Sequence, residues 1–196
     1  MAADEYDGLG PILRQVLRRL AGDGEDVGAV RAAVPGWREA VILHDPGGIA
    51  ASLISDAQEW SWVPLERRCD LWAAERVTAL AEEVHKLVAA RRRGDRPTAA
   101  VQRSLLAVHL VPIMAVHRRI LCGSENRPCH LASDSMGEGW RVAQDAALGL
   151  HDEPFEETVR AALRLYGLAA DEVRDLLDGI QDRVVRHARE LPGAKV

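Results

Sequence analysis

One apolar segment constrains the fold more than any other part of this sequence. Residues 105–116 are apolar at every position except His109, and helical spacing continues on both sides, over residues 99–121. A helix this apolar has no broad polar face to turn toward water, so it needs other helices around it. Pro112 lies inside the segment and is expected to kink it, because proline has no amide hydrogen. The sequence therefore predicts a helical bundle with this segment at its centre.

Further helices are predicted on both sides of the apolar segment. Apolar residues recur at a helical period over residues 9–20, 27–34, 49–56, 66–93, 125–136, 139–150, 153–168 and 170–191. Together with residues 99–121, this pattern indicates an all-α fold, a bundle of about eight helices. Helix ends are predicted from breaking and capping residues: Pro35 after the second helix, Thr98 and Asp152 as N-caps, and Gly167 between the last two helices.

The N-terminal region contains the one strand that the sequence predicts. Residues 39–44 form a short aliphatic run, and Asp45-Pro46-Gly47-Gly48 follows as a turn. A single strand forms no sheet, so we expect it to pair elsewhere or with a second chain. We accordingly divide the chain into an N-terminal segment, residues 1–48, which contains the strand, and a helical bundle domain, residues 49–196.

Charge and composition narrow the function classes. The net charge of −5 argues against a nucleic-acid partner, and no apolar run reaches the roughly 18 residues of a membrane span. The three cysteines do not suggest a disulfide framework, so a reducing, cytoplasmic location is expected. Cys122, Cys129 and His130 lack the close ligand pairs of a structural zinc site, and we predict neither a metal nor a cofactor.

Several short motifs follow one another between residues 37 and 120. A run from Ala40 to Gly48 is followed by residues 49–53, and then by Leu71-Trp72, His85-Lys86-Leu87, Arg93-Gly94-Asp95 and Ala99-Ala100. In this order they resemble the helical half of the aminoglycoside and lincosamide nucleotidyltransferases of the DNA-polymerase-β-like superfamily. The resemblance implies a bundle that closes over a small substrate beside a catalytic domain.

The catalytic motifs of that family do not accompany the resemblance. Its chemistry needs a Gly-Ser turn for the nucleotide phosphates and an Asp-x-Asp pair for two magnesium ions. The N-terminal region contains neither, and Gly123-Ser124 lies far downstream. We therefore expect no nucleotidyl transfer by this chain alone.

Candidate catalytic residues lie near the apolar helix. His109 and His117 are eight positions apart on it and share roughly one face, and Glu125 follows shortly after. These three are the predicted acid–base groups, with the alternative that the histidines are hydrogen-bonded between packed helices.

Candidate substrate-binding residues surround the same helix. Arg118 and Arg119 are predicted to hold an anionic group and Asn126 a polar one, although arginines at a helix end also compensate the helix dipole. Trp72 offers a stacking surface and Glu83 a carboxylate, with core packing and solvated helix surface as the alternatives. No metal ligand is predicted.

Three functions remain open on the sequence. The leading hypothesis is a nucleotidyltransferase-like helical domain that binds a small polar molecule, a nucleotide-related ligand or a partner catalytic domain. The first alternative is an enzyme that modifies small molecules through His109, His117 and Glu125 in a bundle pocket. The second is a structural bundle that forms a homodimer.

Overall fold

The computed structural model describes residues 27–122 and 128–191, and every regular element within these ranges is helical. The predicted all-α class is confirmed. The α-helices are α3 (Val27–Arg38), α4 (Ile49–Glu59), α5 (Glu66–Ala79), α6 (Ala81–Arg92), α7 (Arg96–His117), α8 (Pro128–Met136), α9 (Glu138–Leu148), α10 (Phe155–Glu172) and α11 (Gly179–Glu190). Two short 3₁₀ helices, η2 (Val63–Leu65) and η3 (Arg174–Leu176), precede α5 and α11.

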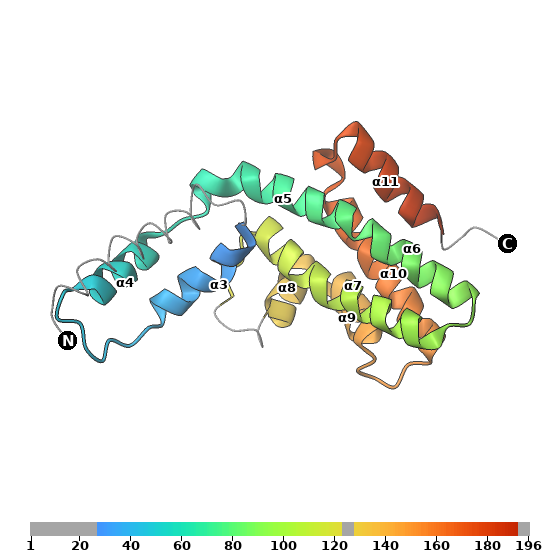
Figure 1. The fold of residues 1–196 in the computed structure, drawn as a ribbon, viewed down its shortest axis with the longest axis horizontal. Helices are drawn as coiled ribbons and strands as arrows, with labels where there is room; N and C mark the ends of the chain where they lie inside the picture. The colour runs from blue at the N-terminus through green and yellow to red at the C-terminus, as the bar shows by residue number, and fades with distance from the viewer. Residues whose placement is uncertain (1–26, 123–127, 192–196) are drawn as a thin grey trace.

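Helix α7 occupies the centre of the bundle, as its composition predicts. It packs against α3, α5, α6, α8, α9 and α10, and one face of it, which carries Val101 and Val108, is exposed (Figure 1). Leu106, Leu110 and Met114 on α7 are fully buried. By length and composition, α7 is the one helix in the described ranges that could cross a membrane, a property that the core helix of a bundle shares. Packing thus accounts for the apolar residues on its buried faces but not for Val101 and Val108, each 56% exposed.

One buried polar group joins α8 to α9. The side-chain oxygen of Gln144 accepts hydrogen bonds from the indole Nε1 of Trp140 at 2.8 Å and from the hydroxyl of Ser133 at 3.2 Å. All three side chains are buried. Because a buried donor without an acceptor is destabilising, Gln144 keeps two donors satisfied at once.

The N-caps of two helices differ from those that the sequence predicts. The residue that caps α7 is Asp95, whose carboxylate accepts the amide of Thr98 at 3.2 Å, so Thr98 is the receiving residue and not the cap. Helix α10 begins after Pro154, and Asp152 lies outside it with a φ of 59°. In both cases the cap lies a short distance from the predicted residue.

Two helix boundaries in the bundle are also wrong in the prediction. The expected helix over residues 66–93 is two helices, α5 and α6, separated by Leu80, and these lie nearly end to end (Figure 1). Helix α10 runs through Gly167 to Glu172, and α11 begins only after Asp178. Asp178 and Gln181 form a capping box, which sets the start of α11.

The predicted strand over residues 39–44 is wrong: this stretch is irregular and exposed. The side chains of Val41 and Leu43 are 80% and 94% exposed, and residues 27–122 and 128–191 contain no strand that could pair with this stretch. The carboxylate of Asp45 accepts the amides of Ile49 and Ala51, both at 2.9 Å, and these hydrogen bonds lower its pKa. The aliphatic run thus leads directly into the start of α4.

Helices α3 and α4 form an arm that extends from the bundle (Figure 1). Helix α3 continues through Pro35 and Gly36, where the sequence predicts its end. Arg38 joins the two helices, because its guanidinium donates to the carbonyls of Ala57 at 2.7 Å and Trp60 at 3.0 Å. The predicted helix over residues 9–20 lies outside the described residues.

A candidate ligand groove between α5, α6 and α7

A groove of about 510 Å³ lies where the end of α5 and the start of α6 face the middle of α7. Three side chains that the sequence singles out, Trp72, Glu83 and His109, line it together. The other lining residues are Arg76, Ala79, Leu80, Glu82, Pro112 and Ile113. The groove therefore combines an apolar surface with charged groups of both signs.

Two polar atoms in this region are buried and have no hydrogen-bond partner among the residues that the structure describes. They are the indole Nε1 of Trp72, a donor, and Oε2 of Glu83, an acceptor. The other oxygen of Glu83 lies 3.2 Å from the ammonium of Lys86, and the guanidinium of Arg76 lies 5.3 Å from the centre of the Trp72 ring. Within the described part of the chain, one donor and one acceptor beside the groove thus have no hydrogen-bond partner.

The elements that form the groove explain the position of these groups. Glu82 and Glu83 lie in the first turn of α6, where the helix dipole stabilises negative charge. Lys86, one turn later, approaches Glu82 to 2.8 Å, and this contact lowers the pKa of Glu82. Across the groove, Pro112 has no amide hydrogen for the carbonyl of Val108, the residue before His109.

His117 lies in a second polar region, at the end of α7. Its Nδ1 is 3.1 Å from Oδ1 of Asp70 on α5, and its Nε2 is 4.0 Å from Glu172 on α10. The contact with Asp70 lacks the alignment of a hydrogen bond. Arg118 pairs with Glu172, and Arg119 pairs with Asp70 at 2.8 Å. The two arginine–carboxylate pairs and the two histidine contacts join the end of α7 to both α5 and α10.

The surroundings of His117 favour its neutral form. Burial lowers its pKa, and the cationic Arg118 and Arg119 act in the same direction. Asp70 and Glu172 act in the opposite direction without reversing the result. In the pH range in which an ordinary histidine begins to gain a proton, the imidazole of His117 is therefore still neutral. Beside it, burial raises the pKa of the Cys69 thiol, so this cysteine is a packed side chain and not an activated nucleophile.

Arg119 occupies the position after the end of its helix at which two other helices have glycine. Helices α6, α7 and α9 end in the same Schellman motif, with paired backbone hydrogen bonds across the last turn. The left-handed residue is Gly94 in α6 and Gly149 in α9, but it is Arg119 in α7, with a φ of 60°. An L side chain is strained in this conformation. The strain is offset by bonds from its guanidinium to Asp70 at 2.8 Å and to the carbonyl of Glu66 at 2.7 Å.

The structure separates the predicted catalytic residues. His109 lines the groove, whereas His117 lies eight residues along α7, which corresponds to about 12 Å of helix rise. Glu125 and Asn126 lie outside the described residues. Arg118 and Arg119 are engaged by carboxylates of the chain itself, so an anionic ligand would have to compete with these pairs. Among the described residues no group of three or more candidate ligands could hold a metal ion.

Sequence reasoning missed three residues of these regions. Arg76 lies four positions after Trp72 on α5, and this i, i+4 spacing is a signal that could have identified it. Asp70 and Glu172 are 47 and 55 positions from His117, and no local pattern marks them. Only the packing of α5 and α10 against α7 brings these carboxylates to the histidine.

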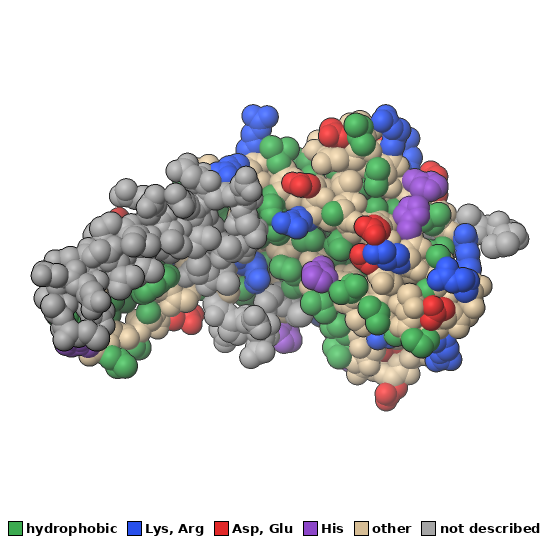
Figure 2. Space-filling model, viewed as in Figure 1, with side chains coloured by type: hydrophobic (Ala, Val, Ile, Leu, Met, Phe, Trp, Pro, Cys, Tyr) green, Lys and Arg blue, Asp and Glu red, His purple; other side chains and the backbone are tan. Residues whose placement is uncertain are grey.

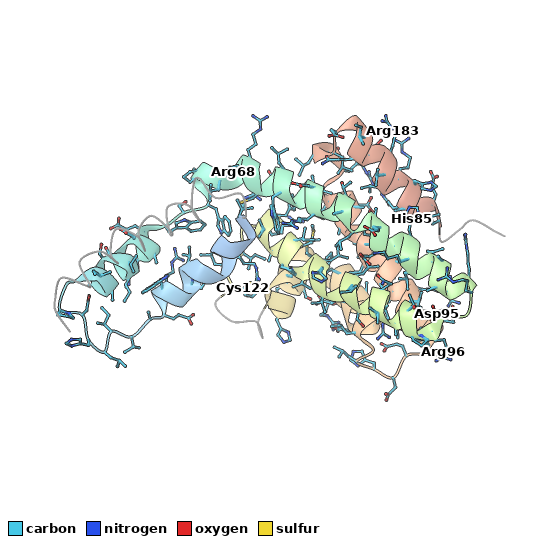
Figure 3. All side chains as sticks on the ribbon, viewed as in Figure 1. Arg68, His85, Asp95, Arg96, Cys122 and Arg183 are labelled. Atoms are coloured by element: carbon cyan, nitrogen blue, oxygen red, sulfur yellow. The ribbon has the colours of Figure 1, made fainter. Side chains whose placement is uncertain are left out.

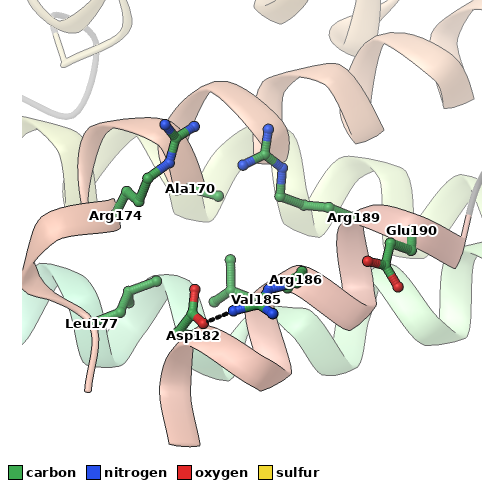
Figure 4. A pocket seen from close by; sticks show the side chains of 8 residues that line it. All are labelled: Ala170, Arg174, Leu177, Asp182, Val185, Arg186, Arg189 and Glu190. Atoms are coloured by element: carbon green, nitrogen blue, oxygen red, sulfur yellow. Dashed lines mark hydrogen bonds and ion pairs between the residues drawn. The ribbon is translucent and has the colours of Figure 1, made fainter. Parts of the chain in front are cut away.

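A second hollow, of about 400 Å³, lies between the end of α10 and α11 (Figure 4). Three of the side chains that line it are arginines, each paired with a carboxylate of the chain. Arg174 and Arg189 share Asp171, and Arg186 pairs with Asp182. Because each arginine already contacts a carboxylate, this hollow is a weaker candidate for an anion site than the arginine content suggests.

The fold and the groove together define the class of protein: an all-α bundle with a polar groove beside its central helix. Comparison of the chain with models of protein families, with curated proteins and with solved structures gave no match. The resemblance to antibiotic nucleotidyltransferases is therefore still a prediction from the sequence.

Proposed function

We propose that this protein binds a small polar molecule in the groove between α5, α6 and α7. The observation that carries the proposal is that Trp72 Nε1 and Glu83 Oε2, beside the groove, have no hydrogen-bond partner in residues 27–122 and 128–191. A buried polar atom without a partner destabilises a fold by about 1–3 kcal/mol, and more when the atom is charged. A ligand that hydrogen-bonds both atoms after a small side-chain movement would recover that free energy on binding.

The chemistry of the groove limits the ligand. Glu83 favours a donor, and a protonated amine would form a charge-assisted hydrogen bond with it. Trp72 favours an acceptor such as a hydroxyl or carbonyl oxygen. Leu80, Pro112 and Ile113 offer apolar contact to a carbon framework. A molecule that carries an amine and several oxygens on a compact framework meets all three conditions, as aminoglycosides and amino nucleosides do.

The proposed role is binding without nucleotidyl transfer by this chain alone. The groove is lined by Glu82, Glu83 and His109. Its lining does not include the Asp-x-Asp pair or the phosphate-binding turn that nucleotidyl transfer requires. A partner catalytic domain would supply that chemistry if the resemblance in sequence reflects common ancestry.

Binding can be tested by titrating the ¹⁵N-labelled chain with a panel of aminoglycosides, lincosamides and nucleosides. The chain has five tryptophans, and the Trp72→Phe variant assigns the indole signal of Trp72. We expect a binder to shift that signal with saturation, while the other indole signals move less. If no compound in the panel shifts the Trp72 signal at millimolar concentration, the proposal is refuted for these ligand classes.

A matched pair of variants tests the role of Glu83. Glu83→Gln removes the charge that faces the groove, and we expect it to weaken an amine-bearing ligand by about 10- to 100-fold, the strength of a charged hydrogen bond. Glu75→Gln makes the same change at an exposed glutamate on α5 that does not line the groove. Equal affinities for the two variants would contradict the proposed contact.

A further inference from the structure

Two histidines from different helices meet on the surface away from the groove. His85 on α6 and His187 on α11 have ring centres 5.2 Å apart, with an angle of 41° between the ring planes. Both side chains are exposed. Figure 2 shows two adjoining histidine side chains where α11 lies against α6.

The spacing of the rings agrees with two imidazoles bound to one metal ion. A zinc–nitrogen bond is about 2.0–2.1 Å, and an imidazole nitrogen lies about 1.1 Å from its ring centre, so each centre would lie about 3.2 Å from the metal. At a tetrahedral angle, two such rings have centres about 5.2 Å apart. The ring centres already have this separation, and rotation of the two exposed side chains would turn one nitrogen of each ring toward a shared ion.

Three cationic side chains near the pair are engaged by the chain itself. Arg92 on α6 donates to the carbonyl of Leu191, one turn after His187, at 3.1 Å. Lys86, which follows His85, is paired with Glu82 and Glu83, and Arg186, which precedes His187, is paired with Asp182. Figure 3 places Arg183 toward the start of α11, at the end away from His85.

We propose that His85 and His187 form a two-histidine site for a divalent transition metal such as Zn²⁺, Ni²⁺ or Cu²⁺. Nitrogen donors favour these ions over Mg²⁺ and Ca²⁺, which prefer oxygen ligands. Water completes the coordination, since the described residues contain no third protein ligand for the same ion. The ion would join α11 to α6 across a contact in which α11 buries only Val185 and Ala188.

The test is calorimetric titration of the full chain with zinc chloride, together with thermal unfolding in the presence and absence of zinc. We expect one saturable site, and a higher unfolding temperature with zinc. Each of His85→Ala and His187→Ala should weaken binding at least about tenfold, since the loss of even an indirect partner of a metal ligand has that effect. Both residues are exposed, so the variants are expected to fold.

The control is His151→Ala, which removes an exposed histidine that has no histidine neighbour in the described part of the chain. This variant should bind zinc as the original chain does. The inference is overturned if the original chain takes up no zinc at millimolar concentration, or if the double variant His85→Ala/His187→Ala binds as tightly as the original chain. It is also overturned if zinc raises the unfolding temperature equally in all variants.

Discussion

The left-handed residue at the end of α7 leads to a prediction about stability: at this position a glycine variant should be more stable than an alanine variant, the reverse of the usual order in a helix. Arg119→Ala and Arg119→Gly both remove the bonds to Asp70 and to the carbonyl of Glu66, so a comparison of the two isolates the backbone. At a φ of 60°, a residue with a Cβ atom is disfavoured by about 1–2 kcal/mol. Glycine loses about 0.5–1 kcal/mol through its greater freedom in the unfolded chain. The glycine variant should therefore be the more stable by about 1 kcal/mol.

Gly167 provides the matched control with the opposite sign. It lies inside α10 with ordinary helical geometry, and a Cβ atom there would meet nothing within 4 Å. Gly167→Ala should therefore stabilise the protein by about 0.5–1 kcal/mol.

Urea unfolding followed by circular dichroism measures both comparisons as free energies of unfolding. For a chain of this size, 1 kcal/mol corresponds to about 2–4 °C in thermal midpoint. If Arg119→Ala is as stable as Arg119→Gly or more so, the backbone strain assigned to Arg119 does not exist. A destabilising Gly167→Ala would refute the assignment of that glycine to an unobstructed helix interior.

Three further predictions concern the bundle. Gln144→Met should lower the free energy of unfolding by about 2 kcal/mol, because Trp140 and Ser133 lose their shared acceptor. Trp140→Phe should be less destabilising in the Gln144→Met background than in the original chain. If the effects of the two substitutions on the free energy of unfolding are additive, the hydrogen-bond network is contradicted. Burial lowers the pKa of His117, so the unfolded chain gains a proton near its ordinary value of 6.5 while the folded chain gains it only at lower pH. Stability should therefore fall as the pH drops below about 6.5, and this part of the pH profile of urea unfolding should flatten in His117→Gln; an unchanged profile would exclude the effect. Asp178→Ala removes the N-cap of α11 and should lower the unfolding free energy by about 1 kcal/mol, whereas no change would mean that the capping box does not stabilise α11.

The sequence predicts the helices of this protein better than their ends. The apolar helix and its central position follow from burial, which depends on the average character of many residues. The ends depend on single contacts. Leu80, which separates α5 from α6, carries no breaking signal, and Gly167 carries one that packing overrides. The strand prediction failed because a β-prone run needs a neighbouring strand, which the described residues do not offer.

The candidate groove could be predicted in part. Trp72, Glu83 and His109 were singled out for separate chemical reasons, and the groove brings them together. Their convergence depends on how α5 and α6 lie against α7, which no local pattern contains. The partners of His117 were beyond prediction for the same reason, since Asp70 and Glu172 come from helices distant in the sequence.

The end of α7 also shows that the residues which determine a helix end can lie outside that helix. In α6 and α9 the signal is local, because a glycine adopts the left-handed conformation without help from the rest of the molecule. In α7 the left-handed residue is Arg119. Its guanidinium bonds to Asp70 and the carbonyl of Glu66 on α5, and also to the carbonyls of Val116 and His117 in its own helix. An isolated peptide that spans α7 would lose the bonds to Asp70 and Glu66, so only contacts within the helix would hold its last turn. The end of α7 is therefore stabilised in part by contacts with another helix, α5.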